Sequence, residues 1–194
     1  MDEAVVYIVD DDEHLCAALS SVIGKFHLKT SIYHTAEEFL VALPLSNIGC
    51  ILLDIRMGKM SGLELQQELT NKGCQLPIIF LTGHATIRMA VQAVKLGAFE
   101  FLEKPFDNDR LVKLVQSAIN QSRKTDKAAH KLDVLTNGER EIFDKLVQGK
   151  TNKEIANENG LSIRTVEFHR RNIKDKTSST TLADLINLAN SGDK

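Results

Sequence analysis

Reactive side chains follow four short apolar runs in the first half of the sequence. If these runs are strands of one parallel sheet, their carboxyl ends meet at a single edge, where such sheets bind ligands. The residues that would gather at this edge are Asp10, Asp11, Asp12, Asp54, Thr82 and Lys104.

Three or four carboxylates at one edge would repel one another unless a cation joined them. An open, oxygen-rich site of this kind suits Mg²⁺, or Mn²⁺ in its place. A metal, the Lys104 ammonium and the Thr82 hydroxyl around one carboxylate can transfer a phosphoryl group to that carboxylate. We expect Asp54 to attack, while the metal and Lys104 neutralise the phosphoryl oxygens.

The elements that must position these side chains alternate along residues 1–121. Between the apolar runs lie helical stripes, each with apolar residues three and four apart. This alternation predicts a doubly wound α/β domain with a five-stranded parallel sheet. The expected strands are residues 5–9, 28–32, 50–53, 78–81 and 99–102, and the expected helical stripes are 15–26, 35–40, 65–73, 86–96 and 111–121.

The second half of the chain is organised differently. Residues 122–133 are polar, and this linker either extends the preceding helix or forms a flexible tether. Residues 134–194 hold four helix signals and no strand pattern, which predicts a small all-α domain of four helices. The signals are the capping boxes Thr136–Glu139 and Thr151–Glu154, the N-cap Ser162 and the stripe from Leu182 to Ala189.

Composition restricts the class of protein. The chain has 194 residues, a net charge of −2, 43% hydrophobic and 26% charged residues, which excludes wholesale disorder. No apolar run approaches the roughly 18 residues of a membrane span, and no secretory signal is visible, so we expect a cytoplasmic protein with no membrane partner. Charge is uneven, because residues 162–176 hold five basic and two acidic side chains.

This basic stretch predicts a helix with two distinct faces. Val166 and Ile173 lie seven residues apart and share an inward face, which leaves Phe168 on the outward face. An exposed Phe among arginines suits a helix in the DNA major groove, where Arg reaches guanine and an apolar group meets a thymine methyl. A plain basic surface helix is the alternative, but the preceding TNKEIANENGLSIRTV favours DNA binding. The outward positions are Arg164, Phe168, Arg171 and Asp175, with Glu167 and Lys174 beside them.

Several motifs resemble a known family. VDDDE, LLDIRM, LTGHA and EKPF resemble the receiver domain of bacterial two-component response regulators, and LTNGEREIFDKLVQGKTNKEIANENGLSIRTVEFHRRNI resembles a LuxR-type helix-turn-helix. Apart from the linker, the whole chain is similar to the FixJ/NarL class. The resemblance implies a flavodoxin-like receiver at 1–121 and a DNA-binding domain at 134–194. It implies a transcriptional regulator that a sensor histidine kinase switches by phosphorylating Asp54, and that then dimerises, binds promoter DNA and contacts RNA polymerase.

The resemblance also implies roles for individual residues. Phe101 would turn inward when Thr82 rotates toward the phosphoryl group, and Lys104–Pro105 matches the family's cis peptide. Gly58 stands where the family usually has proline. The metal ligands would be Asp10, Asp11, Asp54 and the backbone carbonyl of Arg56, and the switch residues Thr82, Phe101, Lys104 and Pro105. The base contacts would be Glu167, Phe168 and Arg171, and the phosphate contacts Lys153, Thr165, His169, Arg170 and Lys174.

Two other functions compete with this interpretation. One is a phosphatase or mutase that forms an aspartyl-phosphate, and the other is an adaptor whose second domain binds protein. Such enzymes usually carry a second Asp two residues after the nucleophile, where this chain has Arg56. We therefore expect no metabolic enzyme, with autodephosphorylation as an allowed side reaction. Whether the unphosphorylated receiver masks the basic helix stays open.

Overall fold

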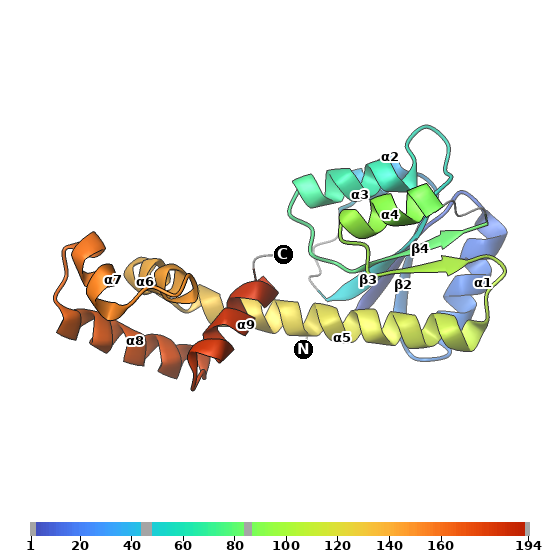
Figure 1. Cartoon of the computed structure of the whole chain (residues 1–194). Helices are drawn as coiled ribbons and strands as arrows, with labels where there is room; N and C mark the ends of the chain where they lie inside the picture. The colour runs from blue at the N-terminus through green and yellow to red at the C-terminus, as the bar shows by residue number, and fades with distance from the viewer. Residues whose placement is uncertain (1–2, 44–47, 84–86, 193–194) are drawn as a thin grey trace. The chain divides into compact units, whose positions relative to one another are not determined.

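The computed structural model describes residues 3–43, 48–83 and 87–192, which form two compact units that divide after Arg123 (Figure 1). The first unit contains a five-stranded, all-parallel sheet with the strand order β2-β1-β3-β4-β5. Its strands are β1 (Val5–Val9), β2 (Lys29–Tyr33), β3 (Gly49–Asp54), β4 (Ile78–Thr82) and β5 (Glu100–Glu103). Its helices are α1 (Glu13–Gly24), α2 (Ala36–Val41), α3 (Gly62–Asn71), α4 (Ile87–Lys95) and α5 (Asn108–Asp133).

Helices cover both faces of this sheet, which confirms the predicted doubly wound architecture. Because side chains alternate along a strand, Val6 and Ile8 face α1 and α5, whereas Tyr7 and Val9 face α2, α3 and α4. The central strands β1, β3 and β4 are buried along almost their whole length, as their apolar runs require. The edge strands β2 and β5 are only partly buried.

Of two predicted helix boundaries, one is wrong and the other is untested. Phe26 was expected on the apolar stripe of α1, but this is wrong, because the helix ends at Gly24 and Phe26 is 45% exposed. His27 then takes a positive φ of 57°, which turns the chain toward β2. The predicted start of a helix at Thr86 lies outside the described residues, and α4 is described from Ile87.

The polar segment at residues 122–133 is helical, because α5 continues to Asp133. Of the two alternatives, extension of the preceding helix is the one observed. The division into compact units falls after Arg123, so residues 124–133 group with the second unit. Leu132, at 4% exposure, packs in the core of that unit, and Ser122 accepts a hydrogen bond from Gly49 N–H at 3.1 Å within the first unit.

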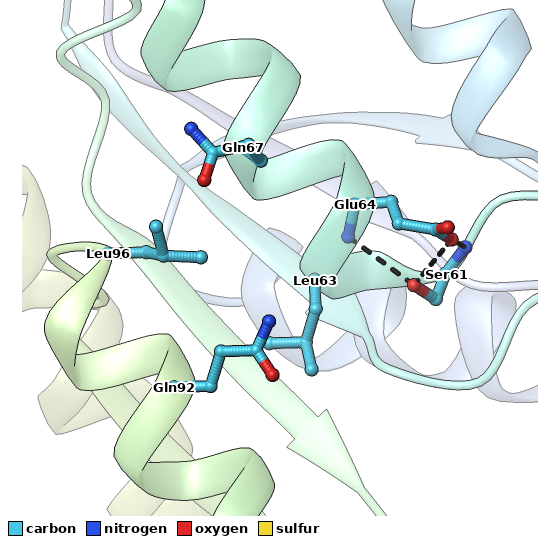
Figure 2. A pocket seen from close by; sticks show the side chains of 6 residues that line it. All are labelled: Ser61, Leu63, Glu64, Gln67, Gln92 and Leu96. Atoms are coloured by element: carbon cyan, nitrogen blue, oxygen red, sulfur yellow. Dashed lines mark hydrogen bonds between the residues drawn. The ribbon is translucent and has the colours of Figure 1, made fainter.

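The second unit contains the four predicted helices, and three of them begin at the predicted capping residues. Thr136 and Thr151 form full capping boxes with Glu139 and Glu154, and Ser162 accepts from Thr165 N–H at 3.0 Å. In the first unit Ser61 and Glu64 form the same box before α3 (Figure 2). The four helices are α6 (Asn137–Val147), α7 (Asn152–Asn159), α8 (Ile163–Thr177) and α9 (Leu182–Gly192).

An ion pair between a buried carboxylate and an exposed lysine joins two of these helices. Lys176 Nζ on α8 lies 2.6 Å from Glu139 Oε2 on α6, and Glu139 also accepts from the Thr136 N–H and hydroxyl. The hydrogen bond from Lys176 is the main cause that lowers the pKa of Glu139 to about 2.

Among the residues described, no helix is long and apolar enough to cross a membrane.

We expect Lys176→Met to lower the unfolding free energy of the second unit by about 1–2 kcal/mol, because a buried carboxylate loses its charged partner. Since the folded pKa of Glu139 lies below the ordinary 4.5, this contribution is present above pH 4.5 and is lost as the pH falls toward about 2. Amide exchange of α6 and α8 in the full chain, compared with the parent at each pH, measures the difference.

The matched control is Lys150→Met, which removes the nearer of two lysine partners of the more exposed Glu158 and leaves Lys145 at 3.6 Å. An exposed pair of this kind contributes about 0–1 kcal/mol. Equal losses in the two variants, or a loss for Lys176→Met that persists at low pH, would contradict the assignment.

Candidate functional site

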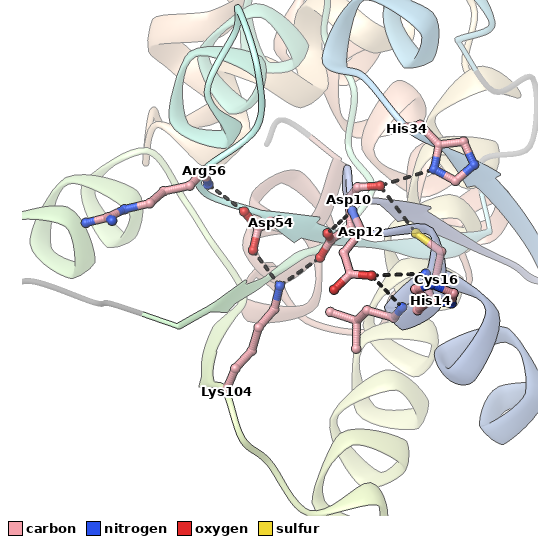
Figure 3. Close-up of polar contacts among 9 residues, drawn as sticks. Asp10, Asp12, His14, Cys16, His34, Asp54, Arg56 and Lys104 are labelled. Atoms are coloured by element: carbon pink, nitrogen blue, oxygen red, sulfur yellow. Dashed lines mark hydrogen bonds and ion pairs between the residues drawn. The ribbon is translucent and has the colours of Figure 1, made fainter.

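Three charged side chains meet at the carboxyl edge of the sheet (Figure 3). Lys104, just after β5, donates from Nζ to Asp10 Oδ2 at 2.8 Å and to Asp54 Oδ1 at 2.6 Å. Asp10 follows β1 and Asp54 ends β3, and these strands are neighbours in the sheet. Asp10 and Asp54 are 1% and 7% exposed as residues, so two buried acids share one ammonium, which offsets one of their two negative charges.

Backbone amides hold the other oxygen of each carboxylate. Arg56 N–H donates to Asp54 Oδ2 at 2.6 Å, and Asp12 N–H donates to Asp10 Oδ1 at 2.9 Å. All four carboxylate oxygens therefore have a donor, which fixes both side chains. The Arg56 side chain is exposed and points away from the two acids (Figure 3).

Burial and charge act in opposite directions on the titration of this cluster. Burial raises the pKa of Asp54 above its ordinary value, and the hydrogen bond and charge of Lys104 offset part of this increase. For Lys104, burial acts to lower the pKa, but the hydrogen bonds that it donates to Asp10 and Asp54 outweigh burial and raise the pKa overall. Lys104 thus stays protonated at neutral pH and keeps a fixed cation beside Asp54.

The three consecutive acids after β1 separate into different roles. Asp11 and Asp12 are exposed, and Asp12 Oδ1 accepts from the N–H groups of His14 and Leu15 at 3.0 Å, which makes it the N-cap of α1. In the part of the chain that the structure describes, no three His, Cys, Asp or Glu side chains gather as ligands of one metal ion. The groups at the edge are nevertheless oxygen donors, which are the ligands that Mg²⁺ prefers.

The expected switch residues lie beside this cluster. Thr82 ends β4 at 2% exposure, and its carbonyl accepts from Lys104 N–H at 2.8 Å. Phe101 on β5 is half-buried and lies opposite Phe80, with ring centroids 5.1 Å apart. The Lys104–Pro105 peptide is cis, as predicted.

Sequence reasoning missed three neighbours of the site. The Cys16 thiol donates to the Asp10 carbonyl at 3.3 Å, and His34 Nδ1 lies 3.4 Å from the same oxygen. At Gly62, a Cβ would lie 2.1 Å from the carbonyl oxygen of Asp54, and its N–H donates to Ile55 O at 3.0 Å. Only glycine lets α3 begin this close to the strand that carries Asp54. The position of Gly62 just after the N-cap Ser61 gave no hint of this contact.

In the second unit, α8 presents the predicted outward face. Val166 and Ile173 are fully buried, whereas Phe168 is 59% exposed. The exposed residues of this candidate interface are Lys153, Arg164, Glu167, Phe168 and Arg171.

The other four proposed contacts of this unit are half-buried, and three of them have hydrogen bonds within it. The Arg170 guanidinium donates to Asn152 Oδ1 on α7, and Lys174 Nζ donates to Thr180 O at 2.7 Å. His169 Nδ1 is buried with no hydrogen-bond partner among the described residues, and the His169 ring lies against Phe168. Thr165 is half-buried, and its hydroxyl lies 2.8 Å from Ser162 Oγ. These four contacts with DNA phosphates stay predictions.

A parallel 2-1-3-4-5 sheet with an acid–lysine cluster at its carboxyl edge, followed by a helix-turn-helix unit, is the architecture of a two-component response regulator. Residues 6–116 match the response regulator receiver domain, and residues 133–189 match the bacterial regulatory proteins of the luxR family.

The sequence matches to similar proteins cover nearly the whole chain. The transcriptional regulatory protein FixJ of Bradyrhizobium diazoefficiens is 35% identical over 191 residues, which are 95% of this chain and 93% of that protein. TdiR of Thauera aromatica is 38% identical, over 97% of this chain and 86% of that protein. The crystal structure of full-length FixJ from B. japonicum matches with a TM-score of 0.59, 34% identity and 98% coverage of both chains.

The chain therefore belongs to the LuxR-type response regulators, the FixJ-like two-component transcriptional regulators. This family combines a receiver with a DNA-binding domain, which implies a kinase partner and DNA as ligand. It is a family of transcriptional regulators, so the alternative of a metabolic aspartyl-phosphate enzyme falls away.

We expect Gly62→Ala to lower the unfolding free energy of the first unit by about 1–3 kcal/mol, because the new methyl group must displace the Asp54 backbone. Tyrosine fluorescence reports this unit alone, since the chain has two Tyr (Tyr7 and Tyr33, both in the first unit) and no Trp. The control is Gly58→Ala in the same loop, where a Cβ meets nothing within 4 Å. A similar loss in both variants would show that the contact at Gly62 is unimportant.

Proposed function

We propose that Asp54 accepts a phosphoryl group from a sensor histidine kinase, and that the modified receiver then controls DNA binding by the second unit. The observation that carries this proposal is the buried Asp54 carboxylate held between the Lys104 ammonium at 2.6 Å and the Arg56 N–H at 2.6 Å. Both donors lie where they can stabilise negative charge on an acyl phosphate.

The transfer would break a P–N bond to the kinase histidine and form a P–O bond to a carboxylate oxygen of Asp54, and the imidazole leaves with a proton. Lys104 is the fixed cation of the site, and it would move its hydrogen bonds from the two carboxylates to the phosphoryl oxygens. Slow hydrolysis of the same acyl phosphate would reset the protein.

A divalent cation, Mg²⁺ or Mn²⁺, would be held by Asp10, Asp11, Asp54 and the Arg56 carbonyl. Receiver domains generally bind Mg²⁺ in such an acidic pocket, and the oxygen donors of this edge suit it. When bound, the cation would neutralise charge on the phosphoryl oxygens. Asp10 is already buried and oriented by the Asp12 amide, whereas the exposed Asp11 would have to turn toward the site.

Phosphorylation would be transmitted through Thr82 and Phe101. Thr82 would rotate toward the phosphoryl group, and the half-buried Phe101 would turn into the space beside Phe80. We infer that this remodels the face made by α4, β5 and α5, on which two chains then pair. A dimer would bind two DNA half-sites in the bacterial cytoplasm and contact RNA polymerase there.

On DNA, α8 would enter the major groove. The exposed Arg171 would read guanine, and Phe168 would meet a thymine methyl group, with Arg164 and Glu167 beside them. Lys153 would contact a phosphate, and so would Arg170 and Lys174 after giving up their present partners. Thr165 and His169 complete the proposed phosphate contacts.

Asp54→Asn should abolish Mg²⁺-dependent labelling by acetyl phosphate, because an amide keeps the shape of the side chain but is not a nucleophile. The matched control is Asp12→Asn, since Asn at this position still caps α1 and Asp12 is not the acceptor. Labelling of Asp54→Asn at the parent level would refute the assignment, and loss of labelling in Asp12→Asn, which keeps the cap, would mean that the negative charge of Asp12 is needed.

Arg171→Ala should weaken binding to a cognate site, selected from random DNA by the phosphorylated protein, more than binding to unrelated DNA. The lost base contact should cost about 1–3 kcal/mol of discrimination. Lys153→Ala should weaken both interactions alike and reduce the salt dependence, because it removes a phosphate contact. Identical profiles for the two variants in a titration at several salt concentrations would contradict the outward face of α8.

A further inference from the structure

A buried amide connects α3 to the end of α4. Gln66 on α3 is 1% exposed, and its Nε2 donates to the carbonyls of Ala93 and Leu96 at 3.2 Å each. Ala93 lies in the last turn of α4, and Leu96 directly follows its last residue, Lys95. The Ala93 oxygen also accepts from the N–H groups of Leu96 and Ala98, whereas Gln66 is the donor to the Leu96 oxygen among the described residues. A side chain of α3 thus caps the C-terminus of α4.

The nitrogen of this amide has hydrogen-bond partners, but its oxygen has none among the described residues. Gln66 Oε1 is buried and has no hydrogen-bond partner among the described residues. A buried acceptor without a donor is destabilising, and methionine would fill a similar volume without that cost. What Gln66 supplies, and an apolar side chain would not, is a fixed position for the end of α4.

The rest of the seam between these helices is open toward solvent. A groove of about 400 Å³ separates the outer edges of α3 and α4, with Gln67 on one side and Gln92 on the other (Figure 2). Val91 and Val94, on the outward side of α4, are exposed. Helix α4 is therefore anchored strongly at one end and only loosely along its outer edge.

We propose that Gln66 is a positioning residue of the switch, which holds the C-terminal end of α4 so that the helix pivots about this end when the receiver is phosphorylated. The proposal rests on the proposed function, because it deepens the route from Asp54 to the pairing face. Gln66 touches neither Asp54 nor Lys104 in the hydrogen bonds described, so it acts through α4 and not on the phosphoryl transfer.

The test compares Gln66→Met with Gln67→Met, the same substitution at the adjacent, exposed position whose amide donates to Asn71. Three measurements are made on the full chain: amide exchange along α4, labelling of Asp54 by acetyl phosphate, and mass by light scattering with and without beryllofluoride. A melt followed by tyrosine fluorescence verifies that both variants fold.

In Gln66→Met we expect α4 amides to exchange about tenfold faster than in the parent, because the anchor of the helix is lost. Labelling of Asp54 should stay within about twofold of the parent, since the acid–lysine cluster is untouched. Pairing should occur in part without beryllofluoride, so that the ratio of dimerisation constants with and without this mimic falls at least about threefold. Gln67→Met should match the parent in all three measurements.

Exchange of α4 within about twofold of the Gln67→Met control overturns the role of Gln66. Faster exchange with an unchanged dimerisation ratio also overturns it, because Gln66 would then be a structural residue only. Failure of the parent itself to pair in beryllofluoride instead refutes the pairing step of the proposed function. In that case the exchange comparison still decides whether Gln66 positions α4.

Discussion

One shared ammonium group determines how the first unit is built. Two carboxylates buried at the end of adjacent strands would repel each other, and Lys104 is the cation that makes their proximity tolerable. To bring it there, the chain must place β1 beside β3 and return through β4 to β5. Only parallel strands, linked by helical crossovers, align all of these carboxyl ends at one edge.

The second unit is built differently, because one face of α8 is left exposed. Its core needs only the inward stripe of α8, which packs against α6 and α7; Val166 and Ile173 lie in one apolar cluster with residues of α6, α7 and α9. Capping boxes and the Glu139–Lys176 pair fix the helix ends without using that outward face. Arg170 and Lys174 also strengthen the unit itself, so each would have to exchange an internal hydrogen bond for a DNA phosphate.

Local patterns were enough to predict much of this arrangement. The strands appeared as apolar runs, and most helix starts appeared as a Ser or Thr followed three residues later by Glu. At the start of α2 the capping box is incomplete, because Thr35 accepts from Glu38 N–H but Glu38 accepts from His34 N–H. The acid–lysine edge followed from topology alone, because residues that end parallel strands must meet. These are short-range or periodic signals, and they can be read without knowing which elements touch.

Features that depend on contacts between distant elements could not be read in this way. Gly62 matters because α3 begins against Asp54, and Gln66 because α3 meets the end of α4. The helical state of residues 122–133 was ambiguous, since few apolar residues mark an inner face there; Ala128 and Leu132 are the buried ones. The exposure of Phe26 depended on where α1 stopped, which Gly24 and the turn at His27 decide.

The thiol of Cys16 lies against the acidic edge and donates to the Asp10 carbonyl. Burial, aided by the nearby carboxylates, raises the pKa of this thiol to about 11. At pH 7 only roughly one molecule in ten thousand would carry the reactive thiolate. A reactive thiolate at Cys16, beside Asp10, would be oxidised to a sulfenic acid or a mixed disulfide and would make this edge sensitive to oxidants. The raised pKa of the Cys16 thiol instead disfavours the thiolate that peroxide and electrophiles attack, so it works against an oxidant response at this edge.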